Sequence, residues 1–262
     1  MSTLLARALQ GLPEIGAGDD LPQLILDALG SETLTGERLI AIAQKAVSKA
    51  EGATVALADV RPQERARELA AALGKDPRFV QVVLDESVEV LRAERGVLIC
   101  RTHHGFVCAN AGVDTSNARS SEEVILLPRQ PDESARRIRA RLRELIRAPA
   151  SGAPPASDGA PAVLISDSFG RAWRHGQLDI AIGLAGMAPT DDWRGRTDSS
   201  GLQLQATWLA VADAAAAAAD LARAKDSREP IVLIDGLERF LTDDDGPGAR
   251  ELLRPLEEDM FR

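Results

Sequence analysis

Two short segments of this chain place carboxylate, hydroxyl and amide groups directly after predicted strands. Asp114 stands in NAGVDTSN, with Asn117 three residues further on, and Asp167 and Ser168 follow the apolar run AVLIS. Carboxylates at strand ends, beside a hydroxyl, suit Mg²⁺, which takes hard oxygen ligands and keeps water and phosphate in its shell. Asp, Ser and Asn are also common turn residues, so residue types alone favour a structural role in turns.

Other candidates for chemistry are weaker. The chain contains no GxxxxGK[ST], no GxGxxG after a strand, no GxSxG and no HExxH. His103 and His104 fall in an expected hairpin turn, where a solvated role is favoured over catalysis, and the third histidine is His175. Cys100 and Cys108 could pair across that hairpin, but two buried, reduced thiols are the favoured interpretation.

Strands and turns must position these groups. The apolar run 39–43 is typical of a buried parallel strand, although its periodicity also allows a helix. The polar cluster 44–49 follows it, at the place where ligand groups often lie in open α/β sheets. Further strands are expected at 162–166, 177–187 and 231–235, and a hairpin at 96–112 with Gly105 in its turn.

Helices are expected to cover these strands. Asp19 or Asp20 can cap a helix through Leu29, and other helices are predicted at 62–74, 77–94, 132–147, 202–225 (the longest) and 249–262, the last interrupted at Pro255. A solvated face is favoured over anion binding for the arginines of the helix at 132–147, namely Arg136, Arg137, Arg139, Arg141, Arg143 and Arg147.

Composition excludes several classes of protein. The chain has 262 residues, a net charge of -9, 45% hydrophobic and 27% charged residues, the profile of an ordinary soluble protein. This acidity, with five Phe and no Tyr, argues against a nucleic-acid-binding protein. No apolar run approaches the ~20 residues of a membrane span, and we find no signal peptide, so we expect a cytoplasmic protein.

An Ala/Pro-rich stretch suggests the domain organisation. Residues 148–161 contain four of the chain's Pro and predict an extended linker or loop. We therefore expect an α/β region at 1–147 and a second α/β region at 162–262.

Five segments, taken together, resemble a known family. They are LPEIGAGDDL near the N-terminus, AQKAVSKAEG at 43–52, FVQVVLDES at 79–87, VCANAGVDTSNA at 107–118 and SDSFGRAWRHGQLDIAIGLAG at 166–186. In this order they resemble the coenzyme F420-0:L-glutamate ligases, the γ-glutamyl ligases of deazaflavin coenzyme biosynthesis. The resemblance covers about residues 9–237. It implies that the region 1–147 carries the nucleotide- and metal-binding loops and that the region 162–262 completes the active site.

This resemblance implies a fold and an activity. The expected fold is mixed α/β (α+β) with mixed sheets, unlike P-loop and Rossmann proteins, in an intertwined homodimer. The expected reaction adds L-glutamate to F420-0, with further γ-linked glutamates as an extension, through an acyl phosphate made from GTP with Mg²⁺ or Mn²⁺; K⁺ is an additional candidate ion. The alternatives are a ligase of the same fold with another acceptor or amino acid, and a nucleotide- or deazaflavin-binding protein without turnover.

The resemblance also implies site residues, although it names no catalytic side chain. The implied metal ligands are Asp114, Asp167 and Ser168, and the implied nucleotide-binding residues are Leu12, Pro13, Glu14, Ile15, Gln44, Lys49, Asn117 and Lys225. One segment departs from the family pattern. Relatives usually carry a Met-Gly-Lys or Met-Gly-Glu turn that helps to bind nucleotide and a second metal, whereas this chain reads LARAKDSREP, with Lys225 as the nearest counterpart.

Overall fold

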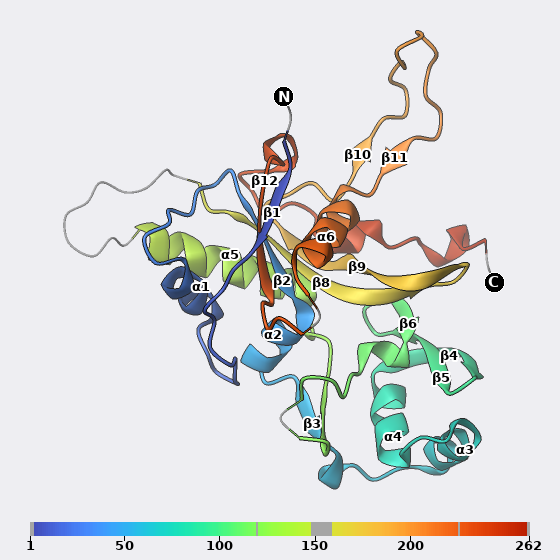
Figure 1. Ribbon diagram of the computed structural model, residues 1–262. Helices are drawn as coiled ribbons and strands as arrows, with labels where there is room; N and C mark the ends of the chain where they lie inside the picture. The colour runs from blue at the N-terminus through green and yellow to red at the C-terminus, as the bar shows by residue number, and fades with distance from the viewer. Residues whose placement is uncertain (1–2, 119, 148–158, 225, 261–262) are drawn as a thin grey trace.

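The computed structural model describes residues 3–118, 120–147, 159–224 and 226–260 (Figure 1). Its centre is a five-stranded sheet in the order β1 (Leu5–Ala8), β12 (Ile231–Asp235), β2 (Leu39–Ala43), β8 (Ala162–Arg171) and β9 (Arg174–Ala185). Only β2 and β8 pair in parallel, so the sheet is mixed. It takes strands from both sides of the predicted linker, whose residues 148–158 lie outside the described residues.

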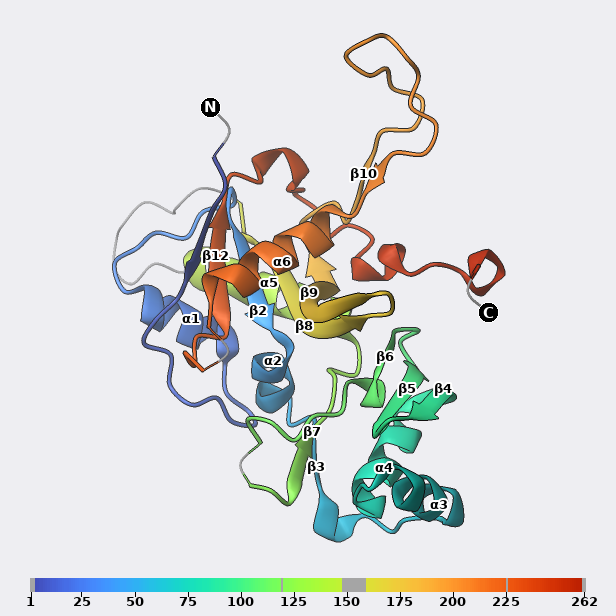
Figure 2. The same ribbon diagram turned by 45° about the vertical axis from the view of Figure 1, so that its right-hand side comes forward.

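Alternating side chains bury both faces of this sheet. Ile40 and Ile165 face α1 (Leu21–Leu29) and α5 (Pro131–Arg147), and Leu39 and Leu164 face α6 (Val211–Ala222). Alanines in α6 allow it to approach the sheet closely. The result is three layers, helix–sheet–helix, with α6 on one side and α1 and α5 on the other (Figures 1 and 2).

A smaller unit lies beside the end of the β8–β9 ribbon (Figure 2). It contains α3 (Glu64–Leu73), α4 (Pro77–Asp85) and a sheet of β4 (Ser87–Glu94), β5 (Val97–Thr102) and β6 (Val107–Ala109). Two connections join it to the body: the pair β3 (Thr54–Ala56) and β7 (Glu123–Ile125), and the packing of β6 against β8. The remaining helix, α2 (Gln44–Ala50), begins directly after β2. Short 3₁₀ turns occur at Leu57–Asp59, Asn110–Gly112, Glu238–Phe240, Ala249–Leu252 and Leu256–Glu258.

A long hairpin projects from the body between β9 and α6. Its base pairs β10 (Asp191–Asp192) with β11 (Trp208–Leu209), and both views show its tip standing clear of the remaining fold (Figures 1 and 2). We call residues 191–209 the arm. The helix expected at 202–225 was therefore too long: only Val211–Ala222 is helical, and α5, with 17 residues, is longer than α6, with 12. The segment before α6 is the returning strand of the arm.

Three other element predictions were wrong in extent. The helix expected at 77–94 ends at Asp85, because SVEVLRAE forms β4 and pairs with β5. The strand expected at 162–166 continues to Arg171, because β9 pairs along its whole length. The helix expected at 249–262 is replaced, within the described residues, by two 3₁₀ turns on either side of Pro255.

Several local predictions are confirmed. Strands occupy 39–43 and 231–235, α3 ends at Gly74 in the left-handed region (φ +65°), and Gly105 turns the β5–β6 hairpin (φ +98°). Cys100 and Cys108 are buried free thiols opposite each other in that hairpin. No helix in the described part of the chain is long and apolar enough to cross a membrane.

The solvated face predicted for α5 is wrong for one arginine. Arg139 is buried, and its guanidinium donates to the backbone carbonyl of Thr242 (2.7 Å) and to the Asp245 carboxylate (2.9 Å).

The cap expected for α1 is not formed by Asp20. Its side chain makes no capping hydrogen bond, whereas the Asp19 carboxylate accepts from the Gly16 N–H at 2.7 Å.

Candidate active site at the end of strand β2

Helix α2 presents two lysines one turn apart. Lys45 and Lys49 are four residues apart and therefore lie on the same helix face. The Lys45 ammonium lies 2.7 Å from an Asp114 carboxylate oxygen, and the Lys49 ammonium lies 2.6 Å from a Glu14 carboxylate oxygen. The helix thus joins the 12–15 loop to the Asp114 turn, two segments that are far apart in the sequence.

Asp114 is held in place by its own turn. Its backbone pairs with Ile125 of β7 through hydrogen bonds of 3.0 and 2.8 Å. Its carboxylate accepts from the Ser116 N–H (2.7 Å) and the Ser116 hydroxyl (3.0 Å). Burial raises the pKa of Asp114, but the hydrogen bonds from Lys45 and Ser116 outweigh it and keep the pKa below its ordinary value. The side chain is therefore a fixed, ionised carboxylate.

Asp167 faces the same cluster from β8. The pairing of β8 with β2 ends at Ser166, opposite Ala43, so Asp167 lies just beyond the last residue of β2. Burial, the largest effect, raises the pKa of Asp167 to about 6; the Ser168 N–H lowers it, the charges of Asp179 and Asp114 raise it, and Lys45 lowers it. Asp167 is thus close enough to Asp114 and Lys45 for their charges to act on its carboxyl group.

Ser168 lies on the opposite face of β8, because side chains alternate along a strand. Its hydroxyl donates to the Asp179 carboxylate at 2.6 Å, and the Ser166 hydroxyl donates to the same carboxylate at 2.8 Å. Arg223, directly after α6, also pairs with Asp179. The structure therefore directs Asp167 and Ser168, which are adjacent in sequence, into different surroundings, and metal binding by Ser168 stays a prediction.

The nucleotide-binding residues implied by the resemblance have different surroundings. Leu12 and Ile15 pack against the main core, whereas Pro13 is exposed. Gln44 is buried, and its amide donates to the Leu126 carbonyl (2.6 Å) and the Ser48 hydroxyl (2.7 Å). Asn117 is exposed, with a left-handed backbone (φ +59°). Lys225 lies outside the described residues.

Sequence reasoning missed the residues that connect these segments. Lys45 was part of the polar cluster at 44–49, and its spacing of four from Lys49 was the available signal. The roles of Asp179 and Arg223 could not be seen in the local sequence, because each residue depends on a partner from another element.

The solvated role predicted for His104 is wrong. Its side chain is half-buried, its Nε2 lies 3.0 Å from the Pro128 carbonyl, and its ring stacks on Phe106 with 5.6 Å between the ring centroids.

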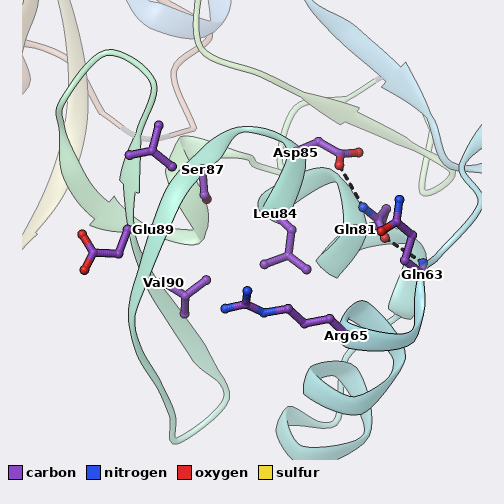
Figure 3. Close-up of a pocket in the computed structure, with 9 residues that line it drawn as sticks. Gln63, Arg65, Gln81, Leu84, Asp85, Ser87, Glu89 and Val90 are labelled. Atoms are coloured by element: carbon purple, nitrogen blue, oxygen red, sulfur yellow. Dashed lines mark hydrogen bonds between the residues drawn. The ribbon is translucent and has the colours of Figure 1, made fainter.

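A cavity of about 240 Å³ lies elsewhere, in the smaller unit between α3, α4 and β4 (Figure 3). The Arg65 guanidinium extends towards it, beside a chain of hydrogen bonds from the Gln63 N–H to Gln81 (2.7 Å) and from Gln81 to Asp85 (2.8 Å). None of the site residues predicted from the sequence lines this cavity. The cluster at the end of β2 is therefore the better candidate site, because its charges match phosphate and metal chemistry.

Comparison with known proteins identifies the family. The model of the F420-0:Gamma-glutamyl ligase family matches residues 11–236. The chain is 41% identical over 256 residues to the coenzyme F420:L-glutamate ligase of Methanothermobacter thermautotrophicus, covering 97% of this chain and 96% of the relative. It is 40% identical over 264 residues to the ligase of the same name from Halobacterium salinarum (95% and 96%) and 39% identical over 251 residues to that of Methanopyrus kandleri (95% and 94%).

The chain belongs to the F420-0:gamma-glutamyl ligase family. It is therefore an enzyme, a ligase, and its mixed α/β structure agrees with the fold class expected from the resemblance. Within the described residues of this gamma-glutamyl ligase, no three His, Cys, Asp or Glu side chains gather to hold a metal. Two carboxylates nevertheless fit Mg²⁺, which proteins commonly bind through one or two carboxylates together with substrate phosphates.

Proposed function

We propose that this ligase joins the amino group of L-glutamate to a carboxylate of the deazaflavin precursor F420-0, with GTP as co-substrate and with further γ-linked glutamates added by the same chemistry. The names of the relatives support the amino acid and the deazaflavin acceptor. The observation that carries the proposal is the convergence of Lys45, Asp114 and Asp167 beyond the end of β2. This arrangement suits a triphosphate and a divalent cation.

The proposed reaction needs an activated carboxylate, because a carboxylate is a poor electrophile with a poor leaving group. An oxygen of the F420-0 carboxylate attacks the γ-phosphorus of GTP, and GDP leaves. The amine of glutamate then attacks the acyl carbon of the resulting acyl phosphate. Inorganic phosphate leaves, the nitrogen loses a proton, and an amide remains. Positioning and electrostatics can carry both steps, so no nucleophilic Ser or Cys is required.

The lysines and the aspartates of the cluster would have different roles in this reaction. Lys49 and Lys45 place ammonium groups on one face of α2, where each can bind phosphate oxygens. Asp114 and Asp167 would hold Mg²⁺ or Mn²⁺, which supplies positive charge against the phosphates when bound. Asn117, at the exposed end of the Asp114 turn, would contact the nucleotide. K⁺ stays an additional candidate ion.

We propose that the ligase works as a homodimer. The arm exposes apolar side chains, with Leu202 70% exposed, Trp208 49% and Leu209 47%. An isolated two-stranded hairpin is only marginally stable in water. A second copy would cover these side chains and would supply a wall for the open cluster at the end of β2.

The proposed function is tested by incubating the pure chain with GTP, Mn²⁺, F420-0 and L-glutamate and analysing the products by mass spectrometry. We expect glutamylated F420 with one GDP released per amide formed. A different adduct, when other acceptors or amino acids are supplied, would instead support the same chemistry on another substrate. Tight binding of GTP and F420-0 without product would contradict the proposed reaction.

A further inference from the structure

A second group of oxygen atoms lies on the α6 side of β8. It comprises the Asp179 carboxylate and the hydroxyls of Ser166 and Ser168, both of which donate to that carboxylate. Asp179 is only 1% exposed and Ser166 also 1%. A carboxylate this deeply buried needs a positive partner, because its charge has lost the solvation of water. Carboxylate and hydroxyl oxygens are also hard donors of the kind that divalent cations accept.

Arg223 places a positive charge against this oxygen cluster. Its guanidinium bonds to the Asp179 carboxylate, and it donates to the Ser166 hydroxyl (3.0 Å) and to the Pro230 carbonyl (3.1 Å). The arginine side chain is only 10% exposed. A guanidinium keeps its charge throughout the physiological pH range, so this positive charge is a permanent part of the fold.

Helix α6 fixes the position of Arg223 at its C-terminal end. In the first turn of the helix, the Asp213 carboxylate accepts from the Ala181 N–H of β9 at 3.0 Å. Arg223 follows the last turn and reaches Asp179, two residues before Ala181 on the same strand. Contacts at the start of α6 and directly after its end thus both reach β9, and moving the guanidinium out of the oxygen cluster would break a buried ion pair.

We infer that Arg223 takes the place of a second metal ion in this ligase, so that the chain binds one divalent cation, at Asp114 and Asp167, and not two. This inference rests on the proposed function for the first cation. The segment after α6 is where the family resemblance implied a second metal, and here that segment contributes a guanidinium to the oxygen cluster. Arg223 thus acts as a positioning residue: it holds Asp179 and the Ser166–Ser168 face of β8, whose other face presents Asp167.

Counting bound Mn²⁺ tests the inference independently of turnover. The full chain, with GDP present, is titrated with Mn²⁺, and free Mn²⁺ is measured by electron paramagnetic resonance. We expect one Mn²⁺ per chain. Two Mn²⁺ per chain would overturn the inference about Arg223, whereas none would contradict the metal use in the proposed function, so the two failures are distinguishable.

Variants of the ion pair sharpen this test. Arg223→Ala removes the guanidinium and leaves the oxygen atoms of Asp179, Ser166 and Ser168, so we expect the count to rise from one Mn²⁺ to two. Adding Asp179→Asn to that variant removes the carboxylate as well, and the count should return to one. A folded Arg223→Ala variant that still binds one Mn²⁺ overturns the inference. If Arg223→Ala fails to fold, the number of Mn²⁺ bound by the wild type tests the inference. Arg223→Lys, which keeps the positive charge, should also bind one Mn²⁺.

Discussion

The Lys45 ammonium and the Asp114 carboxylate lie 2.7 Å apart, although they come from a helix after β2 and from a turn before β7. The same ammonium lowers the pKa of Asp167, though less strongly than burial raises it. The two carboxylates are therefore unequal in the absence of metal: Asp114 is paired and ionised, whereas Asp167 is half-buried and has a raised pKa. A bound divalent cation would provide the positive charge that Asp167 lacks.

Replacing either carboxylate should greatly reduce turnover. Asp114→Asn and Asp167→Asn keep the side-chain volume but remove an anionic ligand. We expect each variant to lose at least ~100-fold in turnover at saturating GTP and Mn²⁺, about 2.7 kcal/mol of transition-state stabilisation. Steady-state assays of GDP release would measure this loss. Asp27→Asn, on the exposed side of α1, is the matched control and should keep wild-type turnover. Near-normal turnover in both site variants would refute the metal assignment.

The same two substitutions should affect stability in opposite directions when metal is absent. Asp114→Asn removes the ion pair with Lys45 and one of the two carboxylate oxygens that accept from Ser116, so its Tm should fall. Asp167→Asn removes a half-buried carboxylate whose raised pKa makes its ionisation unfavourable, so its Tm at neutral pH should stay constant or rise. Calorimetry in EDTA would measure the Tm of both variants and of the wild type. An equal loss of Tm in the two variants would contradict the predicted difference between Asp114 and Asp167.

The stability contribution of Asp167 should depend on pH. The folded chain keeps its proton up to a pKa of about 6, whereas an unfolded Asp loses it near 3.8. Between these values the unfolded state binds fewer protons, so the free energy of unfolding of the wild type falls, relative to Asp167→Asn, as pH rises. The total change is on the order of 3 kcal/mol and levels off above about pH 7. Urea unfolding of both proteins in EDTA from pH 4 to 7 measures this difference in the free energy of unfolding. Parallel pH profiles of the two proteins would contradict the predicted contribution of Asp167.

Gln44 should contribute to stability even without nucleotide. Gln44→Met leaves the Leu126 carbonyl and the Ser48 hydroxyl without its amide, so we expect the free energy of unfolding to fall by about 1–3 kcal/mol without GTP. Lys49→Met is the comparison, because its partner Glu14 is exposed and such a pair contributes less than about 1 kcal/mol. That variant should instead raise the KM for GTP. An unchanged free energy of unfolding in Gln44→Met would contradict this prediction and would leave ligand binding as the only role of Gln44.

The arm should mediate dimer formation. Light scattering at micromolar concentration should give a dimer, with an interface above ~2,000 Å². Replacing Leu202 and Trp208 together by Ser should shift the chain towards monomer, because both are exposed apolar side chains of the arm. Leu221→Ser, at an equally apolar side chain 89% exposed on α6, is the control and should remain a dimer. A wild-type monomer under these conditions would refute the proposed assembly.

Local patterns were sufficient for much of the fold. The strand at 39–43, the C-cap of α3 at Gly74 and the hairpin turn at Gly105 depend on neighbouring residues and could be predicted from them. The predictions for 77–94 and 202–225 were wrong because a strand partner, or the base of the arm, overrides the local preference for a helix. A sequence window of a few residues contains no information about that partner.

The sequence by itself determined the family and the residue types available for chemistry, because motifs such as NAGVDTSN are contiguous. Only the tertiary structure decided which of these side chains meet. The pairing of β2 with β8 brings Asp167 beyond the end of β2, beside Lys45 and Asp114. The alternation of side chains along β8 then turns Ser168 to the opposite face, towards Asp179 and Arg223. Both outcomes depend on strand pairing between distant segments, which residue order alone does not specify.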